Sequence, residues 1–473
     1  MCDYKYDEAI KDASEILVDA MLGDVDELVE QGRQLDVRVR GVLRRVGAQM
    51  LMRLFTILGA VLVEEARRRG LNVERRKTVT FKTLYGPVEV ESTYLYDETH
   101  GEGARPMRRH FGVVGGRYSD ACERALSHFG SETSYQKATR HFAEHYGWEV
   151  GRTTIRSRTQ SAAEAAKAYL QQRFETARSD YDKPEAKRPS TEELLVEADG
   201  CMIRCGQFMT AAQARDRCEQ KEDYKQLERL KECEDDELVR FMEYKEVRTG
   251  LVRKLHEVDP TYICTRGSWR TVAEQLFAVG CEHGLGFDTQ VVGIGDGANG
   301  LKESLEFSFA HFQYILDHHH MTDHLKETAT LLVEEDEIDD ADQFVEQIVD
   351  RLHDGEVLEV IADLESHLQS MPPPGEEEED KASPGYHRLR RLVDHMTRFC
   401  KCISYGAYAA NDWPLGSGEV ESAHKTVPKG RLDQPGATWK AENLDGMCAL
   451  RVVRENGWWE EMWEYEQARR QAA

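Results

Sequence analysis

"LLVEADGCMIRCG", residues 194–206, is the stretch that decides the fold of this chain. Its apolar run ends at Asp199-Gly200, which is typical of a buried strand followed by a second strand. The stretch "DTQVVGIGDGANG", residues 288–300, repeats the pattern and ends at Asp296-Gly297. In an acidic chain a single Asp-Gly pair is usually only a turn. Two such pairs, each directly after an apolar strand, indicate a sheet that brings two carboxylates together.

The elements predicted around these strands come in a characteristic order. Residue patterns predict a charged helical stretch at 211–238, a third strand at 241–258, a helix at 268–285 and a last strand at 311–320. A helical segment follows, from 321 to about 410. Three strands, a helix, a strand, a helix, a strand and then a helix carrying an acid form the order of an RNase H-like fold. We therefore expect such an α/β core with a large helical insertion.

The helix that carries the acid begins in "WPLGSGEVESAHK", residues 413–425. It offers two glutamates, Glu419 and Glu421, which lie about 200° apart around a helix and cannot both face one site. Glu421 shares a face with His424 and Lys425, which are polar partners compatible with DNA. We expect Glu421 to complete the carboxylate cluster, and Glu419 to stabilise the helix dipole from the first turn.

Three converging carboxylates, Asp199, Asp296 and Glu421, repel one another unless a divalent cation lies between them. Hard oxygen ligands favour Mg²⁺ or Mn²⁺. Two such ions, roughly 3.5–4 Å apart, would activate a water or a 3′-hydroxyl and stabilise the leaving oxygen in phosphodiester cleavage. The sequence therefore predicts a metal-dependent nuclease centre.

The region before residue 190 is predicted to be mostly helical, with helices from 5 to 70 and a β-hairpin at 77–96 around Gly86-Pro87. Residues 134–160 have the pattern of a helix-turn-helix, whose second helix could enter a major groove of DNA. An ordinary helical hairpin is the alternative. The arginines expected to be exposed on the second helix are Arg152, Arg156 and Arg158.

The formal net charge of −25 argues against an evenly basic nucleic-acid coat. The charge is uneven, because the runs 333–342 and 372–380 are acidic and the segment 33–82 is basic. A local basic patch can still bind DNA.

The same composition predicts a soluble, intracellular protein. The most apolar run, 50–63, carries Arg53 and is expected to be a buried helix shorter than a membrane span. Eleven scattered cysteines suit reduced thiols in the cytoplasm.

Several motifs together resemble a known family. They are "VEADG", "GDGANGL", "LDHHHMTDHL", "GSGEVESAHKTVPKGRLDQPGATW" and "ALRVVRENGWW". The chain resembles bacterial insertion-sequence transposases of the Kra type, relatives of the Mutator-like DDE transposases, over roughly residues 85 to 460. The resemblance implies DNA cleavage and strand transfer at the ends of an insertion sequence. It also implies double-stranded DNA as substrate, a homo-oligomer, and a nucleoid-associated place in the cytoplasm.

The resemblance assigns roles to individual residues. Asp199, Asp296 and Glu421 become the DDE triad, and Asp317 with His320 match a D-x-x-H element, where His320 could orient DNA. The alternative is that His320 is only a polar residue at the end of a strand. The basic residues near the last acid would contact phosphates or simply be solvated, and they are Lys425, Lys429, Arg431 and Lys440.

One departure from the family concerns a cysteine pair that members often carry after the N-terminal hairpin. Asp97 and His100 stand where those cysteines would fall, so a zinc knuckle is in doubt. Trp413 and Trp439 flank the basic stretch and could stack on a base, with core packing as the alternative.

Five regions follow from these patterns: 1–115, helical with a β-hairpin; 116–190, helix-turn-helix and linker; 191–320, RNase H-like core; 321–410, helical insertion; and 411–473, the catalytic-glutamate helix and tail. Two other functions remain open at this level. One is a DNA-binding protein derived from a transposase without catalysis. The other is a glycosidase with paired carboxylates, which the basic C-terminal stretch does not favour.

Overall fold

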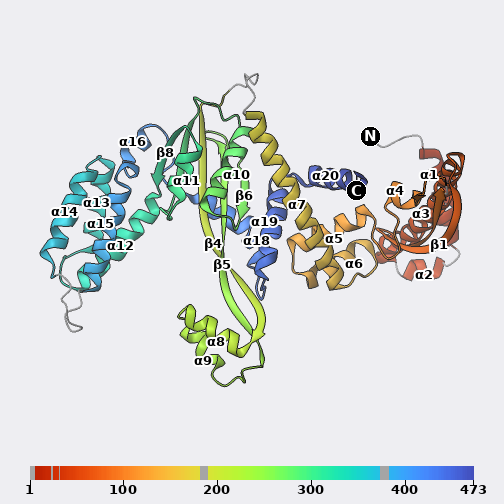
Figure 1. The fold of residues 1–473 in the computed structure, drawn as a ribbon, viewed down its shortest axis with the longest axis horizontal. Coiled ribbons are helices and arrows are strands. Elements are labelled where there is room, and N and C mark those ends of the chain that lie inside the picture. Colours follow the sequence, from red (N-terminus) through yellow and green to blue (C-terminus); the bar gives the residue numbers. More distant parts are fainter. Residues whose placement is uncertain are drawn as a thin grey trace. The chain divides into compact units, whose positions relative to one another are not determined.

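The computed structural model describes residues 6–22, 25–30, 32–97, 99–181, 190–372 and 383–472 (Figure 1). The chain forms two compact units. The first comprises Met1–Gly130 and Tyr135–Arg158, and the second comprises Ser131–Ser134 and Thr159–Ala473. Most of the predicted linker at 179–193 and of the acidic loop at 372–380 lies outside the described residues.

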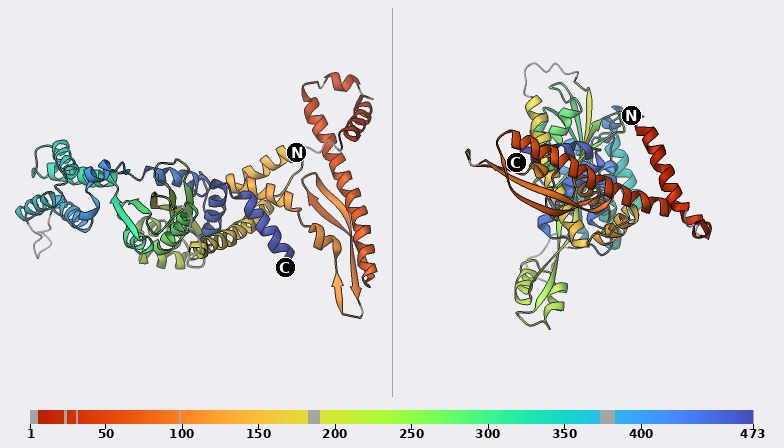
Figure 2. Two further views of the ribbon diagram at one scale, coloured as in Figure 1. Left: turned by 90° about the horizontal axis from the view of Figure 1, so that it is seen from above. Right: turned by 90° about the vertical axis from the view of Figure 1, so that its right-hand side faces the viewer.

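The first unit begins with α1 (Asp7–Leu22), α2 (Val25–Glu30), a short 3₁₀ turn (Gly32–Gln34) and α3 (Leu35–Arg68). The predicted β-hairpin follows as β1 (Asn72–Thr83) and β2 (Gly86–Asp97), with a short third strand, β3 (Glu102–Ala104), and α4 (Pro106–Phe111). The hairpin turns at Gly86, whose φ of +111° favours glycine. The hairpin lies along one side of α3 (Figure 2). Its inward side chains pack on that side of the helix, where Phe55 meets Phe81 edge-on at 6.0 Å between ring centroids.

α3 differs from the expectation of a short, buried helix. None of its residues is buried, because the hairpin covers only one side. By length and composition the helical stretch Gly32–Arg68, which includes the run 50–63, could cross a membrane, so the expectation of a helix shorter than a membrane span was wrong. This is weak evidence for a membrane, since soluble helices pass the same test.

Three helices end the first unit: α5 (Asp120–Glu132), α6 (Tyr135–Tyr146) and the start of α7 (Arg152–Tyr181). They share a core that includes Leu126, Phe142 and Ile155. Gly147, with φ of +69°, ends α6 at the predicted break. Of the three arginines expected to be exposed, Arg158 is half-buried, because it forms an ion pair with Glu123 at 2.8 Å. Arg152 and Arg156 are exposed.

The second unit is built on a five-stranded sheet of order β6-β5-β4-β7-β8. β4, β5 and β6 are antiparallel neighbours, and β7 and β8 run parallel to β4. The strands are β4 (Glu193–Thr210), β5 (Leu238–Lys254), β6 (Thr261–Thr265), β7 (Gln290–Gly295) and β8 (His311–Leu316). The sequence predicted a strand break at Asp199-Gly200, but β4 runs through it, because β5 pairs with β4 along its whole length. Beyond the sheet the pair carries α8 (Ala211–Gln220) and α9 (Tyr224–Leu230) (Figure 1).

Helices cover both faces of this sheet. Gly250 of β5 faces Leu276 of α10 (Trp269–Glu282), whereas the next residue, Leu251, packs with Val420 of α17 (Gly418–Thr426). Successive residues of a strand point to opposite faces. α10 therefore covers one face and α17 the other.

A helical group follows β8, in agreement with the predicted insertion. It consists of α12 (His318–Glu334), α13 (Ala341–His353), α14 (Val357–Ser370), α15 (Pro384–Arg398), a 3₁₀ turn (Cys400–Cys402) and α16 (Tyr405–Ala410). The predicted strand 311–320 was too long: β8 ends at Leu316, and Asp317 caps α12 by accepting a hydrogen bond from the His320 N–H. After α17 come α18 (Lys429–Leu432), a 3₁₀ turn (Ala441–Asn443), α19 (Leu444–Glu455) and α20 (Trp459–Ala472), while α11 (Leu301–Ser308) joins β7 to β8.

Candidate active site

The register of the central strands places Asp199 level with Asp296. In the parallel pair of β4 and β7, Glu197 lies opposite Ile294, and each aspartate comes two residues later. Neighbouring strands are about 4.8 Å apart, and residues two apart along a strand point to the same face. Glu197 accepts a hydrogen bond from the Val420 N–H, so Asp199 also faces α17. Both aspartates thus lie beside the helix that carries the third acid.

The pKa of Asp199 is raised by the charges of the other two acids. Burial raises the pKa of Asp199, the negative charge of Asp296 raises it further, and together they bring it to about 6. Glu421 acts in the same direction, whereas the Gly200 N–H and the charge of His320 lower the pKa. The charges of Asp296 and Glu421 thus both act on Asp199, and a bound cation would relieve this repulsion.

α17 is fixed to the sheet by residues around the triad. Glu197 is 1% exposed, and its Oε2 accepts the Val420 N–H at 2.8 Å. Glu419 forms a two-pronged ion pair with Arg253 of β5, at 2.9 Å from Nε and 2.6 Å from Nη2. Glu419 is thus held by an arginine, a partner that the sequence did not suggest. Glu421 is exposed, and its negative charge raises the pKa of Asp199.

Asp317 holds the start of α17 against the start of α12. Its Oδ2 accepts hydrogen bonds from the N–H and the hydroxyl of Ser417, at 2.5 and 2.6 Å, and its Oδ1 accepts the His320 N–H at 2.8 Å. The side chain is 1% exposed. Burial opposes its charge, yet these hydrogen bonds hold the pKa of Asp317 below its usual value. The structure therefore gives Asp317 an anchoring role and places His320, half-buried, near Asp199.

The accessory residues predicted after Glu421 have different environments. His424 is buried beside Asp199. Its Nδ1 lies 3.6 Å from Oδ2 of Asp199, and its Nε2 lies 3.3 Å from the backbone oxygen of Asp199. Lys425 is exposed and Lys429 is half-buried. Arg431 is 3% exposed and lies over the ring of Trp439 at 4.7 Å, so the expectation that Arg431 contacts phosphate was wrong.

The structure also shows the environments of Trp413, Trp439 and Lys440, which were predicted to contact bases or phosphates or to pack in the core. Trp439 is buried and donates its indole N–H to the Leu432 backbone oxygen, which favours core packing over base stacking. Trp413 is half-buried and donates to Glu193 at 2.9 Å. Lys440 is exposed, beside Glu442.

Two histidines that the sequence reasoning missed line the same region. His395 of α15 packs on the backbone of Gly297, where a Cβ would come within 2.9 Å of its ring. Its ring centroid lies 5.1 Å from that of His324. Burial lowers the pKa of His395 to about 4, and His324 and Arg398 add to this effect. No sequence spacing links α12 to α15, so only the fold could bring these residues to Asp296.

The donor set suits a hard divalent cation, because it offers carboxylate oxygens from three elements. Asp296 keeps one oxygen on the Ala298 N–H and Asp199 keeps one on the Gly200 N–H, which leaves a second oxygen on each. Among the described residues, no three acidic, histidine or cysteine side chains are arranged closely enough to hold an ion as they stand. Closure on a metal would require the exposed Glu421 side chain to move inward.

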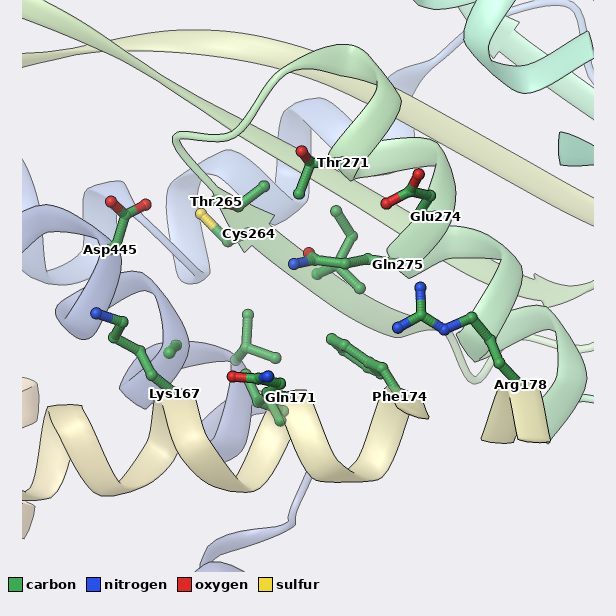
Figure 3. Close-up of a pocket in the computed structure, with 14 residues that line it drawn as sticks. Lys167, Gln171, Phe174, Arg178, Cys264, Thr265, Thr271, Glu274, Gln275 and Asp445 are labelled. Atoms are coloured by element: carbon green, nitrogen blue, oxygen red, sulfur yellow. The ribbon is translucent and has the colours of Figure 1, made fainter. Parts of the chain in front are cut away.

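A cavity of about 340 Å³ lies elsewhere in the second unit (Figure 3). Residues from α7, β6, α10 and α19 line it, among them Lys167, Phe174, Glu274 and Asp445. None of the three acids contributes to it, so this cavity is separate from the candidate active site.

Asp97 and His100, which stand where the family often has a cysteine pair, contact each other. His100 Nδ1 lies 2.7 Å from Asp97 Oδ2, and both residues are in the first unit. Residue 98, between them, lies outside the described residues. The ten cysteines that the structure describes are free thiols, in line with the predicted reduced state.

A protein family matches most of the chain. The model of an uncharacterised protein family, UPF0236, matches residues 27–469, which is most of the 473-residue chain. A comparison with curated proteins found no match.

Proposed function

We propose that this chain, which belongs to the UPF0236 family, is a DDE transposase that cleaves DNA at insertion-sequence ends and joins those ends to a target. The observation that supports the proposal is that Asp199 lies level with Asp296 on neighbouring strands, on the face covered by α17, and that the charges of Asp296 and Glu421 both act on Asp199. The order β6-β5-β4-β7-β8, with the first three strands antiparallel, is also what an RNase H-like core requires.

The roles of the chain's own residues follow from their positions. Asp199 and Asp296, side by side on a rigid sheet, and Glu421 on α17 would hold Mg²⁺ or Mn²⁺. When bound, these ions would polarise the scissile phosphate and lower the pKa of the attacking water or 3′-hydroxyl. Glu197 and Asp317 keep α17 in register by binding its first backbone N–H groups. The half-buried His320 and the exposed Lys425 would contact the DNA backbone.

The experiment uses the full chain, a labelled duplex carrying the candidate element end, and Mg²⁺ or Mn²⁺. Wild type is compared with Glu421→Gln and with Glu419→Gln, a matched change two residues away on the same helix. We expect metal-dependent nicking in wild type and in Glu419→Gln, and its loss, with DNA binding retained, in Glu421→Gln. Nicking that survives in both Glu421→Gln and Asp199→Ala would overturn the proposal.

A second function, DNA binding without catalysis, is favoured by one observation. The predicted helix-turn-helix packs through a real core, and Arg152 and Arg156 of its second helix are exposed. Such a unit could bind DNA without the triad. Wild type that binds the duplex but never nicks it with either metal would move the conclusion to this function.

A further inference from the structure

The cavity of about 340 Å³ in the second unit lies beside β6, an edge strand whose one neighbour in the sheet is β5 (Figure 3). The N–H and the C=O of Tyr262 both bond to the side chain of Asn456, so they point away from β5. The Arg266 N–H also points away from β5, because it donates to Asp445. Backbone groups alternate in direction along a strand, so the N–H and C=O of Cys264 lie on the same free edge.

The backbone groups of Cys264 are a donor and an acceptor without a protein partner. Asp445 and Asn456 of α19 bind the edge on either side, but the residues between them on the same face of the helix are the apolar Ala449 and Val452. Cys264 lines the cavity and is 7% exposed. Within the described ranges, neither its N–H nor its C=O forms a hydrogen bond. Buried backbone groups of this kind are rare, so the site favours a ligand that pairs with them.

The two helices beside the edge fix its direction relative to the cavity. α7 runs alongside α19, since Gly446 lies against Ala163 and Arg173 lies over the ring of Trp458 at 3.9 Å. Arg178, five residues after Arg173, therefore lies toward the end of β6 where α19 finishes. That end is on the N–H side of Cys264, because β6 runs in the opposite direction to α19.

The two ends of the cavity carry opposite charges. Arg178 is half-buried at one end, and Asp445 lies at the other, on the C=O side of Cys264 (Figure 3). Arg178 forms no ion pair with any residue that the structure describes. Lys167, near the Asp445 end, is exposed and already paired with Glu164 at 3.3 Å. A free cation thus stands at the donor end of the Cys264 backbone, and a carboxylate stands at its acceptor end.

We propose that this cavity binds an α-amino acid, either free or at the carboxyl end of a peptide. Two residues in an antiparallel pair exchange both of their N–H···O=C bonds. The ligand nitrogen donates to the Cys264 C=O at the Asp445 end, and the ligand carboxylate accepts the Cys264 N–H at the Arg178 end. Asp445 and Asn456 occupy the edge on both sides, so one ligand residue pairs with the strand.

The rest of the lining limits the class of ligand. Leu170 and Phe174 of α7 and Val452 of α19 offer an apolar wall for its side chain. The volume is near the lower end of the range for small-molecule sites, which suits a single residue of the size of leucine. The charged lining residues are two cations and two acids: Lys167, Arg178, Glu274 and Asp445. Their balance suits a zwitterion better than the phosphates of a nucleotide.

The test measures binding to the full chain by isothermal titration calorimetry. The probes are L-leucine, the tripeptide Gly-Gly-Leu, and L-leucinamide, which lacks the carboxylate. We expect leucine or the tripeptide to bind, and leucinamide to bind at least ~10-fold more weakly, because a charged hydrogen-bond partner of Arg178 is gone. Binding of leucine assigns the site to free amino acids, and binding of the tripeptide alone assigns it to chain ends.

Two matched variants test the position of the ligand. Arg178→Gln should weaken binding of the same probe at least ~10-fold, whereas Lys167→Gln, at the other end, should change it little. Ala449→Leu extends a side chain into the middle of the cavity and should abolish binding. Bound ligand should also slow hydrogen exchange in β6, because the Cys264 N–H becomes bonded. Circular dichroism of each variant separates loss of the site from unfolding.

Three results would overturn the inference. One is the absence of binding by all three probes at millimolar concentration, with hydrogen exchange in β6 unchanged. Another is leucinamide that binds as tightly as leucine and the tripeptide. The third is binding that is equal in wild type and in a folded Arg178→Gln variant. The inference does not rest on the proposed nuclease activity, because every readout is the binding of a small ligand away from the three acids.

Discussion

Replacing Glu197 by glutamine should change how the stability of the second unit depends on pH. Burial raises the pKa of Glu197 from 4.5 to about 8, with the charge of Glu419 adding to it and the Val420 N–H opposing it. Between these two values the folded chain binds more protons at Glu197 than the unfolded chain. The contribution of the neutral carboxyl is therefore fully present below pH 4.5 and is lost as pH rises through 8.

The size of this effect follows from the same pKa values. A rise in pKa from 4.5 to about 8 corresponds to about 5 kcal/mol in the free energy of unfolding, of which about 3 kcal/mol falls between about pH 5.5 and 8.5. Glutamine is neutral at every pH, and its side-chain oxygen can still accept the Val420 N–H. Glu197→Gln should therefore gain about 3 kcal/mol relative to wild type over that range.

Urea unfolding followed by tryptophan fluorescence would measure this difference. Six of the seven tryptophans are in the second unit, since only Trp148 lies in the first. Other titrating groups are common to both proteins and cancel in the comparison. Parallel pH profiles for wild type and Glu197→Gln would show that Glu197 is not a buried carboxyl held neutral, and would refute the reasoning.

Three further changes test the packing around the site and in the first unit. Glu419→Gln removes one charge of the ion pair with the largely buried Arg253 and should lower the free energy of unfolding of the second unit by about 1–3 kcal/mol, measured with urea. Asp317→Asn replaces a carboxylate that accepts two hydrogen bonds from Ser417, so we expect the free energy of unfolding to fall by about 2 kcal/mol and the melting temperature to fall with it. An unchanged melting temperature would contradict the anchoring role of Asp317. Phe142→Ala should lower the free energy of unfolding of the first unit by about 3–5 kcal/mol and speed hydrogen exchange in α5, α6 and the start of α7, which share its core; unchanged exchange there would contradict this packing.

Local patterns were sufficient for much of the secondary structure. Alternation around Gly86-Pro87 predicted the hairpin, and the apolar run before Asp296 predicted β7. The pattern failed at Asp199-Gly200 and at residues 318–320. Strand β4 continues past Gly200 because β5, from a later segment of the chain, pairs with it there. Residues 318–320 are helical because the Asp317 side chain caps α12.

The sequence by itself determined which residues could form the candidate site, because strand order and period place Asp199 and Asp296 on neighbouring strands, and helix geometry separates Glu421 from Glu419. Only the tertiary structure decided what holds them. Arg253 binds Glu419, Glu197 and Asp317 bind the start of α17, and His395 packs on Gly297. The physical reason is that periodicity records which way a side chain points, whereas ion pairs and buried hydrogen bonds depend on which distant segment packs there.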